Sequence, residues 1–227
     1  MEFISAEVCP FAQRTHLVLR EKGLDYEHRE VDLSNKPAWF EDVSPYSKVP
    51  VLKHGDVVVY ESAIINEYIE EIWPEPAFLP ADPRGRALAR IWIDFDNTRF
   101  VPAFYKVLLA REPERRSEIA EALIRHLVFM EDEGLAKLGA DPYWLGTEVS
   151  LVDFAYYPHF ERMCVLSHYR GIEIPERCER LKNWHAAMCE RASVQATAHS
   201  EDYYIESYVK YADNTADGVT AREMRSA

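Results

Sequence analysis

A proline-rich segment sets the strongest limit on how this chain can fold. From Trp73 to Pro83 the sequence reads WPEPAFLPADP, with four prolines in eleven residues. Proline lacks the backbone N–H and clashes with the preceding helical turn, so such a segment continues neither a helix nor a central strand. The 227 residues of the chain allow either one large domain or two small ones, and the proline-rich segment favours two. We therefore expect a first domain over 1–74, a linker over 75–84 and a second domain over 85–211.

The residues before this segment alternate short extended runs with helical ones. Two β-rich runs flank His54, Gly55 and Asp56, and a short glycine-containing loop in that setting indicates a hairpin. Apolar residues then recur at helical spacing after Ser62. The pattern predicts the order βαβαββα, with elements at 2–5, 10–22, 26–31, 36–42, 51–53, 57–60 and 63–72.

The residues after the segment are almost wholly helical in pattern. Ser150 and Asp153 have the spacing of a capping box, in which two side chains satisfy free N–H groups at a helix start. The last stretch, 212–227, is small and polar, and we expect a flexible tail there. The apolar periodicity predicts helices over 85–110, 113–139, 151–168 and 176–191.

Charge and apolar patterning exclude several classes of function. With 26 Lys and Arg against 39 Asp and Glu, the net charge is −13, and a field of this sign repels nucleic-acid phosphates and anionic lipids. No apolar run approaches the roughly 20 residues of a membrane helix, and no secretion signal is visible at the start. We expect a cytoplasmic protein with no nucleic-acid or membrane partner. The four cysteines form neither a CxxC pair nor a metal-binding spacing, so we expect free thiols and no metal.

Cys9 is the candidate for chemistry. It precedes Pro10 at the start of the first predicted helix, where free N–H groups and the helix dipole favour an anion and lower the pKa of a thiol. We therefore expect Cys9 to be a nucleophilic thiolate. The alternative is that an unpaired cysteine is simply a small buried apolar residue, and this is our interpretation of Cys164, Cys178 and Cys189.

Several motifs together resemble one family. The chain carries CPFAQR at 9–14, NKPAWF at 35–40, KVPVL at 48–52, YESAI at 60–64, YPHFER at 157–162 and LKNWHAAM at 181–188. In this order they resemble the cysteine-type glutathione transferases, nearest the omega class and related to the lambda and dehydroascorbate reductase classes. The resemblance covers about residues 1–211. It implies the glutathione transferase fold, with an α/β thioredoxin-like N-terminal domain and an all-α C-terminal domain, in agreement with the predicted element order.

The resemblance also implies glutathione as co-substrate and names the residues that bind it. A cis bond between Val49 and Pro50 would expose the Val49 backbone to the cysteinyl part of glutathione. Glu61 and Ser62 would hold the γ-glutamyl group, and Ser62 would do so at a helix N-terminus. The remaining implied contacts are Phe11 and Lys36. Simpler alternatives remain: an edge-strand proline, an ordinary helix cap and a solvated lysine.

The second substrate is less well defined by the sequence. The family's positions suggest a pocket between the domains that contains Tyr105, His159, Arg162 and Trp184. Aromatic residues at helical spacing are commonly core residues instead, and this alternative applies to Tyr105 and Trp184. His159 departs from the aromatic residue usual at its position in the omega class. Arg14, one turn after Cys9, either supports the thiolate or lies on the surface.

These residues lead to a functional hypothesis. Cys9 would take glutathione from a mixed disulfide or thioether-like adduct, and a second glutathione would regenerate it. Position 12 is alanine rather than a second cysteine, so glutathione must resolve the intermediate. Suitable substrates are glutathionylated small molecules or proteins, dehydroascorbate and α-thio ketones. The alternatives are a conjugating glutathione transferase and a non-catalytic interaction protein similar to the stringent starvation proteins. The family further implies a homodimer.

Overall fold

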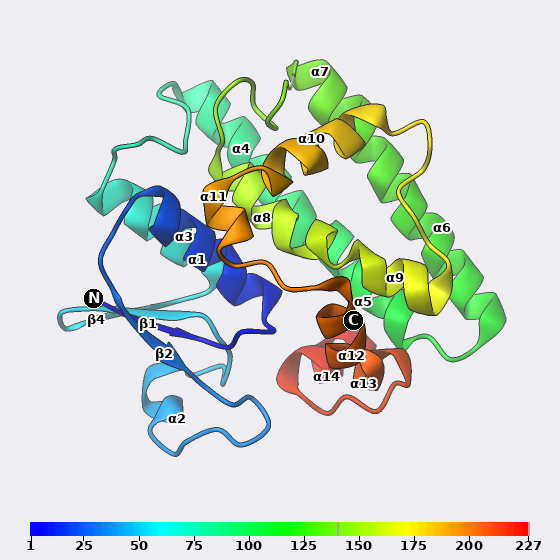
Figure 1. Cartoon of the computed structure of the whole chain (residues 1–227), viewed down its shortest axis with the longest axis horizontal. Coiled ribbons are helices and arrows are strands. Elements are labelled where there is room, and N and C mark those ends of the chain that lie inside the picture. Colours follow the sequence, from blue (N-terminus) through cyan, green and yellow to red (C-terminus); the bar gives the residue numbers. More distant parts are fainter. Residues whose placement is uncertain (140, 227) are drawn as a thin grey trace.

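The computed structural model of the chain describes residues 1–139 and 141–226, with the side chain of Ser226 left out of the description. Two parts are evident in Figure 1: a sheet with its helices, in blue and cyan, and a larger helical part, in green to red. The prediction of an α/β first domain followed by an all-α second domain is confirmed. The change occurs between α3 (Ser62–Ile72) and α4 (Pro83–Phe95), where the proline-rich segment lies.

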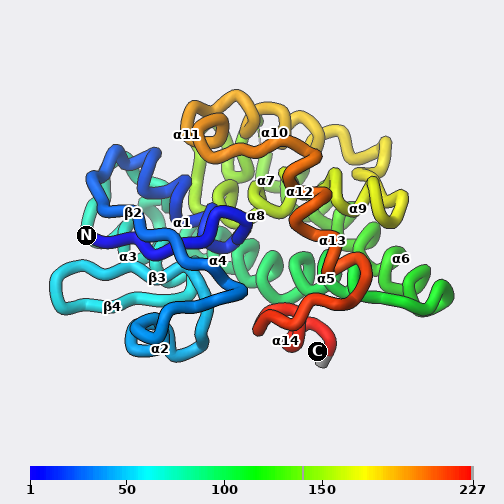
Figure 2. The backbone as a smooth tube through the Cα atoms, turned by 60° about the horizontal axis from the view of Figure 1, so that its bottom comes forward, coloured from blue at the N-terminus to red at the C-terminus, as the bar shows by residue number. Residues whose placement is uncertain are grey.

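The first domain is built on a four-stranded mixed sheet. Its strands are β1 (Glu2–Ser5), β2 (Glu27–Glu30), β3 (Val51–His54) and β4 (Val57–Tyr60), in the spatial order β2-β1-β3-β4. β1 pairs parallel to β2 and antiparallel to β3, with Phe3 opposite Leu52. The central strands are buried on both faces, because α1 (Pro10–Glu21) and α3 cover one side and α2 (Phe40–Val43) lies toward the other (Figures 1 and 2).

The linker between the domains is fixed by a buried lysine. Lys22, just after α1, donates through Nζ to the carbonyl oxygens of Trp73 and Pro76 at 2.6 and 2.7 Å. The same Nζ lies 2.8 Å from the carboxylate of Glu70, which also accepts from the N–H groups of Phe78 and Leu79. A charge buried among so many partners is costly to disturb, so this cluster holds the proline-rich segment in one path.

The second domain consists of helices around a buried central helix. Two π-helical turns, η1 and η2, interrupt the long helices predicted from periodicity, as such turns often do inside α-helices. The remaining elements, in order, are η1 (Asp96–Phe100), α5 (Val101–Leu109), α6 (Pro113–Phe129), η2 (Met130–Leu135), α7 (Ala136–Leu138), α8 (Leu151–Glu161), α9 (Met163–Arg170), α10 (Glu179–Cys189), α11 (Ala192–Gln195), α12 (Glu201–Ser207), α13 (Val209–Ala212) and α14 (Val219–Ser226).

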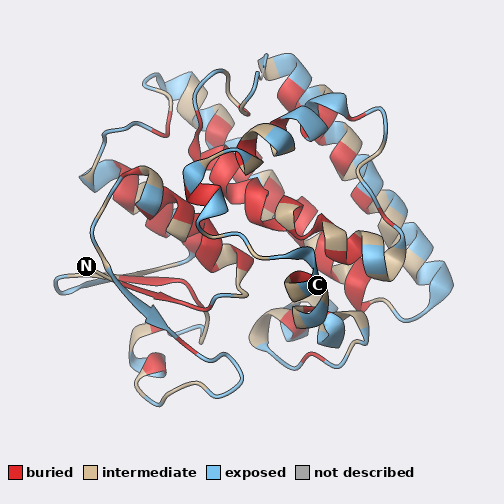
Figure 3. Cartoon of the chain, in the orientation of Figure 1, coloured by how far each residue is buried: buried red, intermediate tan, exposed pale blue. Residues whose placement is uncertain are grey.

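Helix α8 is the core of this domain, with every residue from Leu151 to Phe160 buried (Figure 3). Its predicted capping box is confirmed: the Ser150 N–H and hydroxyl both donate to Asp153 Oδ2 at 2.7 Å. The other carboxylate oxygen, Oδ1, accepts from the Trp144 N–H and from Trp184 Nε1. Four hydrogen bonds to one buried carboxylate therefore tie the start of α8 to two other parts of the domain.

The end of the chain differs from the expectation. We expected residues 212–227 to be a flexible tail, but the structure has α13 ending at Ala212 and α14 over Val219–Ser226. Ala221 is fully buried, and α14 packs against α5, below the helical domain in Figure 1. Tertiary packing of this kind stabilises a short helix whose local sequence alone would not keep it folded.

Across residues 1–139 and 141–226 we found no helix with the length and apolar character needed to cross a membrane.

Candidate active site

A cavity of about 330 Å³ lies at the junction of the two domains and contains Cys9. Its walls come from the start of α1, the loop before β3, the start of α3, η1 and α5, and the segment from α13 to α14. The sequence prediction and the cavity agree on seven residues, which the structure brings together: Cys9, Phe11, Lys36, Val49, Pro50, Glu61 and Ser62.

Cys9 is the N-cap residue of α1, as the Cys-Pro sequence predicts. Its side chain is half-buried, and Sγ lies 3.8 Å from the carbonyl oxygen of Val49. Burial raises the pKa of the Cys9 thiol, and this outweighs the N–H groups of Ala12 and Phe11 and the charges of Arg162 and Arg14, which lower it. The predicted low-pKa thiolate is therefore not what this structure favours. The helix N-terminus acts in the expected direction, but removal of the sulfur from water has the larger effect.

The loop before β3 and the start of α3 form the wall of the cavity next to Cys9. The Val49–Pro50 peptide bond is cis, as the resemblance implies. Glu61 has a φ of 70°, in the left-handed region that a non-glycine residue adopts at a cost and that is common at functional sites. Ser62 follows as the first residue of α3 and is buried. This backbone turns the N-terminus of α3 toward the cavity, where its free N–H groups suit an anion.

Arg14 lies behind Ser62 and is buried, not on the surface. Its guanidinium donates to Asn97 Oδ1 at 2.7 Å, to Ser62 Oγ at 3.5 Å and to Asp96 Oδ2 at 2.5 Å. Burial raises the pKa of Asp96 to about 7, against the lowering effect of Arg14. The ion pair thus joins α1 of the first domain to η1 of the second beside the cavity.

Two lysines, Lys36 and Lys48, also line the cavity. Lys36 donates to the backbone oxygen of Ser47 at 2.7 Å and to its hydroxyl at 3.1 Å. Burial lowers the pKa of Lys36, and the charge of Arg222 on α14 adds to this effect. Lys48 Nζ lies 2.7 Å from the carboxylate of Glu223 on α14. The C-terminal helix α14 therefore places a carboxylate against Lys48, one of the two lysines that line the cavity.

The four residues expected in the second-substrate pocket are all buried, and in the part of the chain that the structure describes none of them lines the cavity. His159 lies directly behind Phe11, with ring centroids 5.3 Å apart. Tyr105 lies behind Tyr211, a cavity residue, at 5.2 Å. Both residues are therefore one layer removed from the cavity surface.

Arg162 and Trp184 have structural contacts. Arg162 donates to Gln13 Oε1 at 2.6 Å, to the Pro158 carbonyl at 2.7 Å and to the Val8 carbonyl at 3.2 Å, and so joins α8 to the loop that carries Cys9. Trp184 donates to Asp153 and packs edge-on against Phe160 at 4.9 Å. It belongs to the core beneath α8, which is the alternative left open by the sequence. A pocket role for Trp184 does not fit this position.

Other cavity residues were missed by the sequence analysis. Tyr46 and Tyr60 pack edge-on at 5.2 Å, and Asn97 and Tyr211 come from the helical domain. The largest omission is α14, which contributes Val219, Thr220, Glu223 and Met224. The tyrosines at 208 and 211, just before the expected tail, were the available signal, because large aromatic side chains are usually at least partly buried.

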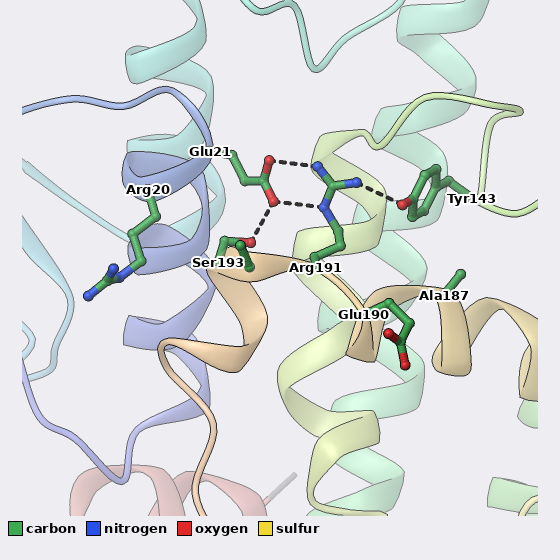
Figure 4. A pocket seen from close by; sticks show the side chains of 8 residues that line it. Arg20, Glu21, Tyr143, Ala187, Glu190, Arg191 and Ser193 are labelled. Atoms are coloured by element: carbon green, nitrogen blue, oxygen red, sulfur yellow. Dashed lines mark hydrogen bonds and ion pairs between the residues drawn. The ribbon is translucent and has the colours of Figure 1, made fainter.

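A second, more open hollow lies between α1 and the segment joining α10 to α11 (Figure 4). Arg191 donates through Nε and Nη2 to the two oxygens of Glu21 at 2.7 and 2.6 Å, and through Nη1 to Tyr143 Oη at 2.7 Å. Ser193 also donates to Glu21. These polar groups satisfy one another, so the hollow has the character of a domain contact.

Comparisons with known proteins agree with this architecture. Residues 8–72 match the family model of the glutathione S-transferase N-terminal domain, and residues 113–187 match that of the C-terminal domain. Glutathione S-transferase U28 of Arabidopsis thaliana is 32% identical, covering 88% of this chain and 89% of the relative. Glutathione S-transferase omega-1 of Sus scrofa is 34% identical, covering 85% of this chain and 78% of the relative.

Solved structures give the same result. Glutathione transferase Omega 3C from Trametes versicolor superposes with a TM-score of 0.83 at 32% identity, covering 94% of this chain and 90% of that one. Rice GST1 (OsGSTU1), solved in complex with glutathione, superposes with a TM-score of 0.84 at 25% identity, covering 95% of this chain and 98% of that one. With both family domains matched and relatives above 30% identity along most of its length, the chain belongs to the glutathione S-transferase family of enzymes.

Proposed function

We propose that this protein is a glutathione-dependent thiol transferase in which Cys9 is the nucleophile. The observation that carries the proposal is the position of the Cys9 sulfur, at the N-cap of α1 and in one cavity with Val49, Pro50 and Ser62. The resemblance to cysteine-type transferases, and relatives that include omega-1 enzymes and a protein named DHAR2, support this mechanism.

Glutathione fits the groups around the cavity. Val49, next to the cis proline, lines the cavity, and its backbone N–H and C=O suit the backbone of the cysteinyl residue of glutathione. The N-terminus of α3 at Ser62 suits the γ-glutamyl carboxylate, and the Glu61 carboxylate suits the ammonium group. Lys36 suits the glycyl carboxylate at the other end. Phe11 lies on the side facing the helical domain. This orientation directs the glutathione sulfur toward Cys9.

The reaction proceeds by two exchanges. The Cys9 thiolate attacks the glutathione sulfur of a mixed disulfide, the new sulfur–sulfur bond forms, and the other thiol leaves as a thiolate that takes a proton from water. A second glutathione, as thiolate, attacks the glutathionylated Cys9 and leaves as oxidised glutathione, which restores the Cys9 thiolate. Ala12 stands one turn after Cys9 and offers no second thiol, so the resolving thiol comes from glutathione.

Reduction of a small glutathione mixed disulfide by the wild type, Cys9→Ala and Cys164→Ala tests the mechanism. Cys164 is the matched control, because it is also a half-buried free thiol but does not line the cavity. We expect Cys9→Ala to lose reduction and Cys164→Ala to retain it. Equal activity in all three proteins would refute the role of Cys9. Aryl-halide conjugation that persists in Cys9→Ala would favour a conjugating transferase, and glutathione binding without either activity would favour an interaction protein.

A homodimer and a cytoplasmic location also remain proposals. Dimerisation is typical of glutathione S-transferases, and Ile64 on α3 and Ile91 on α4 expose apolar side chains that a second copy could cover. The four cysteines are free thiols, as a reducing compartment maintains them. A monomer mass in sedimentation would contradict the dimer.

A further inference from the structure

A cavity of about 480 Å³ lies between the end of α5, the start of α6 and the C-terminal segment that contains α14. Among the described residues it shares only Met224 with the Cys9 cavity, so α14 borders both spaces. Figure 2 shows α14 beside α5, against which it packs. Four cationic side chains distinguish this space, and we call it the basic cavity: Lys106, Arg111, Arg115 and Arg225.

The basic cavity has an excess of positive charge that the other two cavities lack. Its four cations face two carboxylates, those of Glu112 and Glu118. The Cys9 cavity is lined by two lysines and two glutamates, and the hollow beside Glu21 by two arginines and two glutamates. The chain as a whole has a net charge of −13. A local excess of cations on such an acidic protein attracts anions to that place.

Among the described residues, none of the four cations forms an ion pair with a carboxylate. Arg225 donates through Nε to the side-chain oxygen of Asn214 at 2.6 Å, and Arg111 donates to the Asn214 carbonyl at 3.4 Å. These partners are neutral, so they leave both positive charges uncompensated. Lys106 is half-buried, and in the described part of the chain its side chain and that of Arg115 have no hydrogen-bond partner. A bound anion would supply the missing partner.

The end of α5 does not cancel this positive field. The last carbonyl groups of a helix carry a partial negative charge, which would repel an anion. Here Arg170 donates to the carbonyls of Val107 and Leu108. Arg116 donates to the carbonyl of Ala110 at 3.0 Å. Burial lowers the pKa of Arg170, and the charge of Arg116 lowers it further, which shows how closely the cations gather in this part of the molecule.

The rest of the lining is largely apolar. Leu109 is buried, and Ala110, Ile119 and Met224 are half-buried beside it. A cavity of this size with apolar walls and a few placed charges has the features of a small-molecule site. The cations require a negative charge on the ligand, and the apolar groups require hydrocarbon next to that charge.

We propose that the basic cavity binds an organic carboxylate joined to a short apolar chain, and that this ligand is an effector of the Cys9 cavity. The carboxylate accepts hydrogen bonds from Lys106 and Arg115, and the chain lies against Leu109 and Met224. The inference adds a second binding site to the protein and does not depend on the proposed role of Cys9.

Helix α14 connects the two sites. Met224 lines both cavities, and the next residue, Arg225, lines the basic cavity. The preceding residue, Glu223, lines the Cys9 cavity and pairs with Lys48 at 2.7 Å. A ligand seated on Met224 and Arg225 binds α14 only where it packs on α5, and this is the differential affinity that a population shift requires. The ligand therefore keeps the Cys9 cavity enclosed and slows reactions of the thiol with reagents from water.

Calorimetry with octanoate tests the binding site. Octanamide has the same chain without the charge and acetate has the charge without the chain, so each should bind more weakly by about tenfold or more. We expect Lys106→Met to raise the Kd for octanoate by about tenfold, as loss of one charge-assisted hydrogen bond does. Arg115→Gln, at an exposed residue, should raise it by up to about fivefold. Arg125→Gln, on the same helix but outside the cavity, is the control and should keep the wild-type Kd.

Alkylation of Cys9 by iodoacetamide, followed by mass spectrometry of the Cys9 peptide, tests the effector role. Saturating octanoate should slow alkylation of the wild type by about fivefold, at the low end of the couplings found between separate sites. The same concentration should slow alkylation much less in Lys106→Met, because that variant binds octanoate weakly.

Several results would overturn the inference. Absence of octanoate binding, or an equal Kd in wild type, Lys106→Met and Arg115→Gln, would exclude the basic cavity as its site. A Kd that rises in Lys36→Met instead would place octanoate in the Cys9 cavity. An alkylation rate that saturating octanoate leaves unchanged would refute the effector role. None of these measurements uses a disulfide substrate, so the proposed function is tested separately.

Discussion

Glu21 lies at the end of α1, and its carboxylate ties the first domain to the segment that joins α10 and α11 (Figure 4). It accepts two hydrogen bonds from the Arg191 guanidinium and one from the Ser193 hydroxyl. The substitution Glu21→Gln keeps the size of the side chain but removes its charge and one of its acceptors. We expect this change to destabilise the protein through the domain contact.

The size of the effect follows from burial and partners. The side chains of Glu21 and Arg191 are 14% and 21% exposed, so water screens this pair less than a surface ion pair. Hydrogen bonds to a charged group contribute about 1.5–3 kcal/mol, and Arg191 keeps Tyr143 as a partner after the change. We therefore expect a loss of about 2 kcal/mol in the free energy of unfolding, which corresponds to a fall of roughly 4–8 °C in Tm for a chain of this size.

The assay is thermal and urea unfolding of wild type, Glu21→Gln and Glu190→Gln. Glu190 lines the same hollow but is exposed, so its substitution is the matched control and should change stability by less than about 0.5 kcal/mol. Equal stability of the two variants would refute the reasoning.

Acid provides a second test of the same contact. Burial raises the pKa of Glu21, but the hydrogen bonds from Arg191 and Ser193 outweigh it, and the net pKa is lowered from 4.5. The contribution of Glu21 is therefore complete above pH 4.5 and is lost as the pH falls through the lowered pKa. The difference between wild type and Glu21→Gln should shrink in that acidic range. A difference that grows as the pH falls would contradict this assignment.

Two further predictions concern the cavity. Because burial raises the pKa of Cys9, its alkylation by iodoacetamide should accelerate with pH well above neutrality, and a plateau already reached below pH 7 would contradict the burial argument. Glu223→Gln should lower the Kd for glutathione by up to about fivefold in calorimetry, since it removes a carboxylate from Lys48 in the cavity and such exposed ion pairs contribute at most about 1 kcal/mol. Glu206→Gln, a substitution at an exposed residue outside the cavity, is the control. A raised Kd in Glu223→Gln would refute the idea that Glu223 and glutathione compete for Lys48.

The glutathione side of the site could be predicted because its residues lie at the ends of local elements. Cys9 precedes the first helix, Val49 and Pro50 precede β3, and Ser62 begins α3. A βαβαββα order brings these three positions to the same end of the strands. The motifs and the topology therefore predict the same site. The cavity accordingly contains all the residues expected on this side.

The second-substrate side could not be predicted in the same way, because it depends on how helices face one another. Trp184 recurs at helical spacing as a pocket residue would, but only the folded domain shows that its Nε1 reaches Asp153. The C-terminal helix is a similar case. Its sequence is small and polar. The packing of α14 against α5, the burial of Ala221 and the Lys48–Glu223 ion pair supply interactions between residues far apart in the chain.

The state of Cys9 connects these two sides of the site. The sequence shows only the local effect of the helix N-terminus, which lowers the pKa of the thiol, whereas burial in the folded protein raises it. Part of the wall enclosing the sulfur's cavity is α14. If α14 moved away, water would reach the cavity and the burial effect would weaken, while the N–H groups at the start of α1 would stay in place. The reactivity of Cys9 is thus coupled to the position of α14, and Glu223→Gln should accelerate Cys9 alkylation at neutral pH as well as strengthen glutathione binding.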